Sequence, residues 1–304
     1  MKEILRKVDT MQSELIKKYN RQVLIFTDLD GTLLDHYSYE HEDAKVCMER
    51  LMGHGIPIIP NTSKTFAELL ELRKRLNLDG PFIVENGAAI FINKNFLPEK
   101  PKGAVWQDGF WVKSFSSKRN YWLGLIKKVA PEYGHLFESF VDMTIARIVE
   151  LTGLTDEDAV LSSQRQFGEP LLWKGSEDEL DKFILMLRRI GAHPVKGGRF
   201  LHIGGDCNKG IALAWLLREY QRQHKGVTIS TIALGDGKND VSMLEIADTA
   251  VRIASPVHEP PELERSLKLY TSNKLGPKGW TEILDQLIPE SVFFSSSKNT
   301  DKTT

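Results

Sequence analysis

Residues 23–32 have the sequence Val-Leu-Ile-Phe-Thr-Asp-Leu-Asp-Gly-Thr, an apolar run that ends in Asp28, Asp30 and Gly31. Branched and aromatic residues in a row are typical of a central parallel strand that is covered on both faces. The Asp-Gly step allows a sharp turn out of the sheet, at the edge where open α/β sheets bind ligands. Taken alone, the stretch fits a polar turn that only closes a strand equally well.

The composition is that of an ordinary globular protein, with 41% hydrophobic and 27% charged residues among 304. Because 40 Lys and Arg balance 41 Asp and Glu, we expect no nucleic-acid partner and no attraction to anionic membranes. Two cysteines without metal-ligand spacing indicate a reducing compartment. No apolar leader or membrane-length apolar window is found, so we expect a cytoplasmic protein.

Around the opening strand, apolar strands alternate with amphipathic helices. Helices are predicted at 39–52 and 66–76, and strands at 56–59 and 82–84, each strand ending in polar residues. This βαβ series predicts a parallel sheet whose polar strand ends share one edge. The same pattern resumes with helices at 208–223, 241–247 and 279–287 and strands at 227–234 and 249–254.

The segment between these halves has a different pattern, with aromatic residues, glycines and shorter strands. Helices are expected at 117–129, near 154–164 and at 177–190, the last with a Ser176–Glu179 capping box, and strands at 170–174 and 200–203. The fold class predicted is α/β: a Rossmann-like parallel-sheet core at 21–95 and 204–290, with an inserted α+β domain at 96–203.

The two ends of the chain are expected to lie outside this core. Residues 1–20 have apolar side chains at helical spacing, which predicts an amphipathic helix that packs on the core or on a second subunit. A homodimer is therefore one expected arrangement. Residues 291–304 include three consecutive serines and few apolar residues, which predicts a disordered tail.

A second strand ends in an acidic stretch, Gly235-Asp236-Gly237-Lys238-Asn239-Asp240. Acidic tips of two strands in one parallel sheet can converge on a hard cation. Carboxylate oxygens suit Mg²⁺, which also keeps waters and substrate phosphate as ligands. With no histidine or cysteine among these residues, zinc is disfavoured and a magnesium site is predicted.

Two further positions indicate an anion at the same edge. Thr62 and Ser63 follow a strand and precede a helix, whose first N–H groups and dipole favour a negative charge. Lys209 lies at the start of another helix, where the dipole disfavours a lysine unless an anion is near. A fully solvated lysine is an equally good interpretation of that position.

Together these residues provide a nucleophilic carboxylate, a second carboxylate, hydroxyl donors, a cation and a metal site, which phosphoryl transfer requires. The four stretches resemble, in order and context, the four motifs of the haloacid dehalogenase superfamily. The insertion and the Glu85-Asn86-Gly87-Ala88 stretch resemble the Cof-like branch, in which the inserted domain is an α/β cap. The resemblance covers roughly residues 22–288.

Within that branch the chain resembles the mannosyl-3-phosphoglycerate phosphatases, in stretches that include 63–65, 147–154, 165–170, 198–200 and 276–280. The resemblance implies that Asp28 is the nucleophile and Asp30 the general acid and base. It further implies that Asp28, the Asp30 backbone carbonyl and Asp236 hold Mg²⁺. Thr62 and Lys209 would bind the transferring phosphate, while Asn239 and Asp240 would be supporting residues.

A phosphorylated sugar-glycerate, the substrate that this resemblance implies, carries a carboxylate as well as a phosphate. Cations beyond the catalytic set are then needed, and Lys64, Arg165 and Arg199 are the candidates. Glu169 and His202 are candidates for sugar hydroxyls, with Ser63 and Asn86 completing the predicted substrate contacts. For each cap residue, an exposed salt bridge or a satisfied core group is the alternative. A strand tryptophan such as Trp173 is more typically a core residue. His36 and His41 are more typical of a solvated loop than of a metal site.

The resemblance implies a Mg²⁺-dependent phosphatase that forms an aspartyl-phosphate and converts mannosyl-3-phosphoglycerate to mannosylglycerate, a compatible solute. Three alternatives stay open: the glucosyl substrate, another sugar phosphatase or phosphosugar mutase of the same branch, and a binding protein on an inactive scaffold. The retained catalytic residue types make the last of these the least favoured.

Overall fold

The computed structural model describes residues 21–197 and 199–291. The helix expected at 1–20 and all but the first residue of the tail expected at 291–304 therefore lie outside the described residues. The chain forms two compact units, one built from the described residues up to 60 and from 213 onward, the other from residues 61–212.

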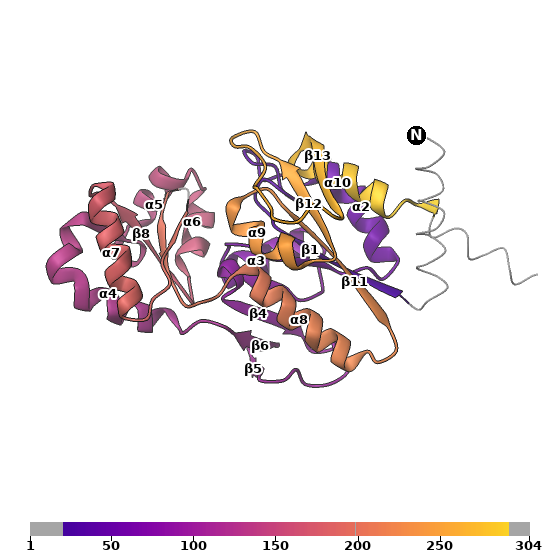
Figure 1. The fold of residues 1–304 in the computed structure, drawn as a ribbon, viewed down its shortest axis with the longest axis horizontal. Helices are drawn as coiled ribbons and strands as arrows, with labels where there is room; N and C mark the ends of the chain where they lie inside the picture. The colour runs from indigo at the N-terminus through magenta and orange to yellow at the C-terminus, as the bar shows by residue number, and fades with distance from the viewer. Residues whose placement is uncertain (1–20, 198, 292–304) are drawn as a thin grey trace, which may run out of the picture. The chain divides into compact units, whose positions relative to one another are not determined.

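The first unit contains the expected parallel sheet. Strand β1 (Arg21–Thr27) lies between β11 (Thr228–Gly235) and β2 (Ile58–Pro60), and β12 (Thr249–Ala254) and β13 (Leu269–Leu275) extend the sheet beyond β11 (Figure 1). All of these pairings are parallel. The predicted Rossmann-like core is thus confirmed, with β13 as a strand that the sequence analysis missed.

The apolar run of β1 is buried because both faces of this sheet are covered. Leu24, Ile25 and Phe26 have no exposed surface, and Trp280 of helix α10 (Gly276–Leu287) is equally buried. The Trp280 indole donates a hydrogen bond to the Thr27 hydroxyl at 3.1 Å. Helix α10 packs against α2 (Glu42–Gly53) and β13, while the short helix α9 (Val241–Ile246) packs against β11 and β12. The core therefore holds β1 rigidly up to its acidic end.

In the second unit, strand β3 (Phe82–Val84) differs from the prediction. It was expected as a third parallel strand, but it pairs antiparallel with β4 (Ala89–Asn93), and its parallel pairing is a single bridge between Ile83 and Asn61. The cause is the turn at 85–87, where three consecutive residues have positive φ and reverse the chain. The sheet continues antiparallel through β6 (Phe110–Ser114) and β5 (Val105–Gln107), and helix α3 (Phe66–Arg75) precedes it in the chain.

The second unit also contains an antiparallel sheet with the order β7-β8-β10-β9. Its strands are β7 (Phe137–Ser139), β8 (Glu169–Trp173), β10 (Leu201–Ile203) and β9 (Val195–Lys196). Helices α4 (Arg119–Tyr133) and α7 (Glu177–Arg189) share a hydrophobic core with this sheet. The expected capping box of Ser176 and Glu179 is confirmed at the start of α7.

The helix expected near 154–164 is confirmed as α6 (Asp156–Ser163), and α5 (Ile145–Thr152), which ends at Gly153 with φ +76°, is a helix that the sequence analysis missed. Helix α8 (Lys209–Gln223) leads from the second unit back to the first. Short 3₁₀ turns lie at Glu85–Gly87, Gly134–Leu136, Phe140–Asp142 and Lys238–Asp240. Across the described ranges, none of the helices has the length and apolar character needed to span a bilayer.

Candidate active site

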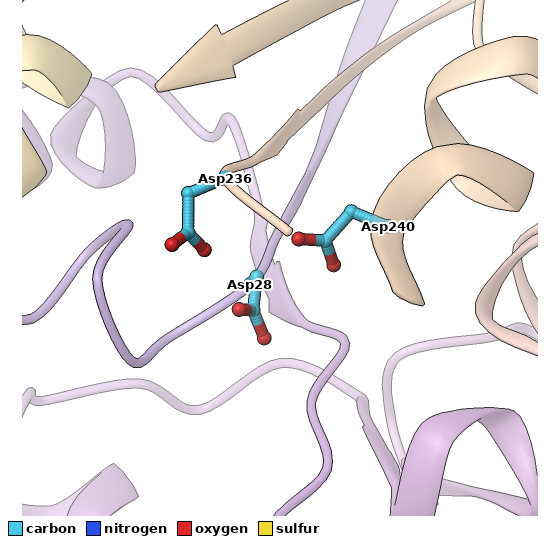
Figure 2. Close-up of side chains that lie close together, drawn as sticks. All are labelled: Asp28, Asp236 and Asp240. Carbon is cyan, nitrogen blue, oxygen red and sulfur yellow. The ribbon is translucent and has the colours of Figure 1, made fainter. Parts of the chain in front are cut away.

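Three buried aspartates converge beyond the ends of β1 and β11 (Figure 2). Asp28 follows β1, Asp236 follows β11, and Asp240 immediately precedes α9. One carboxylate oxygen from each lies within 4.8 Å of the other two. The strands are in register at this point, because the Asp28 N–H donates to the Leu234 carbonyl at 2.9 Å. The sheet therefore brings together residues that are 208 positions apart.

Glycines make room for this cluster. Gly31 has φ +78°, and a Cβ at that position would lie 2.7 Å from Asp236 Oδ2. A Cβ on Gly235 would lie 2.5 Å from the Asp240 side chain. Such distances are too short for non-bonded atoms, so the two glycines permit the close approach of the carboxylates.

Hydrogen bonds orient two of the carboxylates. The Thr32 hydroxyl donates to Asp236 Oδ1 at 3.1 Å, and the Gly237 N–H donates to Asp240 Oδ2 at 2.9 Å. Three carboxylates this close, with at most 6% of each residue exposed, repel one another in a medium of low dielectric constant. A hard divalent cation with oxygen ligands relieves that repulsion, so the donor set fits Mg²⁺.

Asp240 has a more central place than the sequence analysis gave it. It was predicted as a supporting residue, whereas its carboxylate belongs to the same cluster as Asp28 and Asp236. Asp30 lies in the turn after β1, where its backbone bridges to Leu34; the residue is partly exposed, but its Oδ1 atom is buried. Asn239 lies in the 3₁₀ turn that leads to Asp240.

A histidine that the sequence analysis did not consider also borders this cluster. His258 Nε2 lies 3.4 Å from Asp236 Oδ2, and the imidazole is 42% exposed. Its Nδ1 lies 3.1 Å from the Glu259 carbonyl, which can only accept, so Nδ1 carries the proton of that contact. No local motif marks His258, because it follows β12 in a loop of prolines and acidic residues.

In the second unit, Thr62 and its neighbours follow β2 in the chain and precede α3. Thr62 is 1% exposed, its N–H donates to the Ile83 carbonyl at 3.1 Å, and its hydroxyl accepts the Lys64 N–H at 3.2 Å. Helix α3 begins after Thr65, which forms a capping box with Glu68. Of the first N–H groups of this helix, which were expected to favour an anion, that of Glu68 already donates to the Thr65 hydroxyl.

Lys209 is the first residue of α8 and has no exposed surface. The solvated interpretation of this lysine is therefore wrong. Its carbonyl accepts a hydrogen bond from the Asn61 amide at 3.0 Å, and Asn208 Oδ1 accepts the Ile211 N–H at 2.9 Å and caps the helix. A buried ammonium needs anionic or polar partners, which agrees with the functional interpretation of this position.

The turn at 85–87 joins several parts of the second unit. Asn86 has φ +58°, and its N–H donates to the Thr62 carbonyl at 2.9 Å. Gly87 has φ +91°, and a Cβ there would lie 2.1 Å from the Asn208 carbonyl oxygen. The turn therefore passes directly over the start of α8, so Thr62, Asn86 and Lys209 lie in one neighbourhood of this unit.

Arg165 joins this neighbourhood. Its Nε lies 3.4 Å from Glu85 Oε2, and its Nη2 donates to the Ser63 carbonyl at 3.3 Å. Burial and the charge of Arg165 lower the pKa of His202 to about 4, so His202 is neutral near pH 7 and can accept or donate a hydrogen bond. Lys64 forms an ion pair with Glu68 at 3.7 Å.

Two predicted substrate contacts have other partners. Glu169 is fully buried and accepts hydrogen bonds from Arg119 and Ser139, each at 2.6 Å, and from the Val141 N–H at 2.8 Å. These contacts give Glu169 a structural role between β8, α4 and the turn after β7. Arg199 is exposed and donates to the Thr152 carbonyl at 2.9 Å.

Trp173 has the contacts of a core residue, whereas His36 and His41 are each only partly exposed. Trp173 stacks on Phe183 at 5.1 Å between ring centroids, and its indole donates to the Ser176 carbonyl. Among the residues that the structure describes, the aspartate cluster is the only group of three or more potential metal ligands, so His36 and His41 belong to no such group.

A family model for haloacid dehalogenase-like hydrolases matches residues 25–101 and 200–259. These stretches contain all three clustered aspartates together with Thr62, Asn86 and Lys209. Over these two stretches the chain is similar to haloacid dehalogenase-like hydrolases. Residues 102–199 lie outside the match, so Arg165, Glu169 and Arg199 draw no support from it.

Solved structures share the fold of this chain. It is similar to a haloacid dehalogenase-superfamily phosphatase from Bacteroides thetaiotaomicron (TM-score 0.61, 17% identity, 88% of this chain and 96% of that chain). It is also similar to a subclass IIB sugar phosphatase (TM-score 0.56, 16% identity, 87% of this chain and 98% of that chain). A Thermoplasma acidophilum protein is similar as well (TM-score 0.60, 14% identity, 88% of this chain and 98% of that chain). At these identities the likeness establishes the fold alone.

Proposed function

We propose that this protein is a Mg²⁺-dependent phosphatase that removes the phosphate of a phosphorylated sugar-glycerate, with mannosyl-3-phosphoglycerate as the leading substrate. The observation that carries the proposal is the cluster of three buried carboxylates beyond the ends of two neighbouring parallel strands. The match to haloacid dehalogenase-like hydrolases supports hydrolysis as the reaction. The substrate itself rests on the resemblance described from the sequence.

Asp28 and Asp30 have different surroundings, which suits two different roles. Asp28 is 6% exposed, and its backbone is fixed to β11, as a nucleophile requires. Asp30 lies in the turn that follows; its Oδ1 atom is buried, but the residue as a whole is less buried than Asp28, as suits a group that exchanges protons with water.

In the first step, an Asp28 carboxylate oxygen attacks phosphorus while the bond to the glycerate oxygen breaks, and Asp30 gives its proton to that oxygen. In the second step, Asp30 takes a proton from water, whose oxygen attacks the aspartyl-phosphate and releases inorganic phosphate. Asp28 is regenerated as a carboxylate, and Asp30 ends protonated as it began. Mg²⁺, when bound, would neutralise charge on the phosphoryl oxygens.

Asp28, Asp236 and the Asp30 carbonyl would hold that ion, and the position of the Asp240 carboxylate supports adding it as a ligand or orienting group. By the same resemblance, Thr62 and Lys209 are proposed to contact the transferring phosphate. Asn239 would support the metal site.

Arg165 is the best-supported candidate for recognition of the substrate carboxylate. Glu85 and Ser63 hold its guanidinium in one place, and neutral His202 can hydrogen-bond a sugar hydroxyl. Ser63, Lys64 and Asn86 remain proposed contacts, and Arg199 is the proposal's most exposed cation. The cytoplasmic location and the homodimer also remain predictions.

The test is phosphate release from mannosyl-3-phosphoglycerate, its glucosyl counterpart and a simple sugar phosphate, with Mg²⁺ and with EDTA. We expect activity that EDTA abolishes, that Asp28→Asn loses, and that has the highest kcat/KM on the mannosyl compound. Full activity of Asp28→Asn would contradict the nucleophile assignment. A clear preference for the simple sugar phosphate would instead favour the broader sugar-phosphatase alternative, which the shared fold with a subclass IIB sugar phosphatase makes the second candidate.

A further inference from the structure

Glu85 has an unusual set of contacts for a residue at the tip of a strand. Its side chain is 1% exposed, and its carboxylate accepts three consecutive backbone N–H groups, from Gln166 at 2.7 Å, Phe167 at 3.2 Å and Gly168 at 3.0 Å. The backbone of Glu85 has φ +48°, a conformation that is costly for a residue with a side chain. The surrounding contacts therefore favour this carboxylate in one fixed position.

The segment that Glu85 holds is the connection between α6 and β8. Other contacts hold it as well: Ser116 donates to the Phe167 carbonyl at 3.0 Å, the Arg119 N–H donates to the Gln166 carbonyl at 2.7 Å, and Lys118 lies over the buried Phe167 ring. Gly168 passes close to β10, because a Cβ there would lie 3.3 Å from the Ile203 carbonyl oxygen. Three charge-assisted hydrogen bonds make Glu85 the main anchor of this connection.

Arg165 directly precedes the anchored residues and is attached to the same carboxylate. Of its five N–H donors, one on Nη2 donates to the Ser63 carbonyl, while the buried Nε lies 3.4 Å from Glu85 Oε2 in an ion pair that lacks hydrogen-bond geometry. Within the described ranges, no protein acceptor lies within hydrogen-bonding distance of Nη1. One edge of the guanidinium is therefore fixed by the protein, while the other remains available for an anionic ligand.

We propose that Glu85 is a positioning residue for substrate recognition: its carboxylate fixes both the 166–168 backbone and the Arg165 guanidinium, so that Arg165 receives the carboxylate of the substrate. This rests on the proposed function. Loss of the Glu85 charge releases Arg165 and weakens binding of the carboxylated substrate. It leaves the phosphoryl-transfer step, and substrates without a carboxylate, largely unaffected.

The test compares Glu85→Gln with Glu138→Gln, a matched control in which another cap glutamate loses ion pairs to Arg147 and Lys174. KM and kcat are measured on a glycosyl phosphoglycerate and on a simple sugar phosphate. For Glu85→Gln we expect KM for the first substrate to rise roughly 10- to 100-fold, as for loss of a hydrogen bond to a charged group. We expect kcat of Glu85→Gln to stay within about threefold of the native value. KM should change little for Glu138→Gln on either substrate, and for Glu85→Gln on the simple sugar phosphate.

A double-mutant cycle with Arg165→Met separates positioning from general damage. If Glu85 acts through Arg165, Glu85→Gln has little further effect on KM once Arg165 is replaced. Equal losses on both substrates, or independent effects of the two substitutions, would overturn the proposal. Arg165→Met preserves the carboxylate anchor, so it provides the substrate comparison even if Glu85→Gln folds poorly.

Hydrogen exchange gives a readout that does not depend on the substrate. The amides of residues 166–168 are expected to be protected in the native protein and to exchange at least tenfold faster in Glu85→Gln, but not in Glu138→Gln. Unchanged exchange would overturn the anchor. If the native protein ignores glycosyl phosphoglycerates while these amides respond as expected, the substrate proposal fails and the anchoring by Glu85 stands.

Discussion

Asp240→Asn should make the metal-free protein more stable and the metal-loaded protein less so. The three carboxylate oxygens lie within 4.8 Å of one another, and two charges at that separation repel by roughly 3.5 kcal/mol at an effective dielectric constant near 20. Asp240 takes part in two such pairs. The asparagine keeps the size of the side chain and an oxygen that can accept the Gly237 N–H.

Neighbouring polar and charged groups offset part of this repulsion, so we expect a net gain of about 1–3 kcal/mol in the unfolding free energy without metal. Mg²⁺ at a hundred times its dissociation constant should stabilise the native protein by about 2.7 kcal/mol. In Asp240→Asn, which has lost one negative charge from the site, the same Mg²⁺ concentration should stabilise by less than about 1 kcal/mol.

The assay is urea unfolding of both proteins in EDTA and across a Mg²⁺ titration. Asp248→Asn is the matched control, because Asp248 accepts hydrogen bonds from Thr231 and lies outside the cluster. It should change stability equally with and without metal. The reasoning is refuted if Asp240→Asn loses stability in EDTA, or if Mg²⁺ stabilises it as strongly as the native protein.

Two further predictions concern stability. Gly87→Ala, where φ is +91° and the new Cβ would lie 2.1 Å from the Asn208 carbonyl oxygen, should cost at least about 3 kcal/mol, whereas Gly109→Ala, with φ +83° and open space, should cost about 1 kcal/mol. Equal costs by urea unfolding would contradict the close approach. Because the pKa of His202 is lowered from 6.5 to about 4, the unfolded chain binds its proton first as the pH falls. The contribution of neutral His202 to the free energy of unfolding should therefore be fully present above about pH 6.5, and the free energy of unfolding should fall by up to about 3 kcal/mol towards pH 4. His202→Asn should flatten that slope, and an unchanged slope would assign it to other groups.

Strand β1 and its acidic end were predictable because burial on both faces requires a continuous apolar run, and the polar residues after it mark where the strand leaves the sheet. Strand β11 and the acidic stretch after it were predictable for the same reason. Strand β13 was not predicted, because Leu269–Leu275 is mostly polar and its residues are largely exposed, so it lacks the apolar signal of a central strand.

The misassigned features depend on contacts that no local pattern records. The reversal after β3 requires positive φ at Glu85 and Asn86, which only the following glycine suggests in the sequence. Glu85 itself binds backbone groups 81 to 83 positions away. The position of Asp240 in the carboxylate cluster depends on the short turn that follows Asp236. Glu169 looked available for a substrate because its partner Arg119 lies 50 residues away.

The central claim, that Asp28 accepts the phosphoryl group, is tested most directly by acid quench of the working enzyme and mass analysis of its peptides. Asp30→Asn should slow the hydrolysis of the intermediate, so the account predicts that one phosphoryl group accumulates on Asp28 in that variant, in the presence of Mg²⁺ and not of EDTA. A phosphoryl group on any other residue would contradict it. So would phosphate release by Asp28→Asn at the native rate in the same experiment.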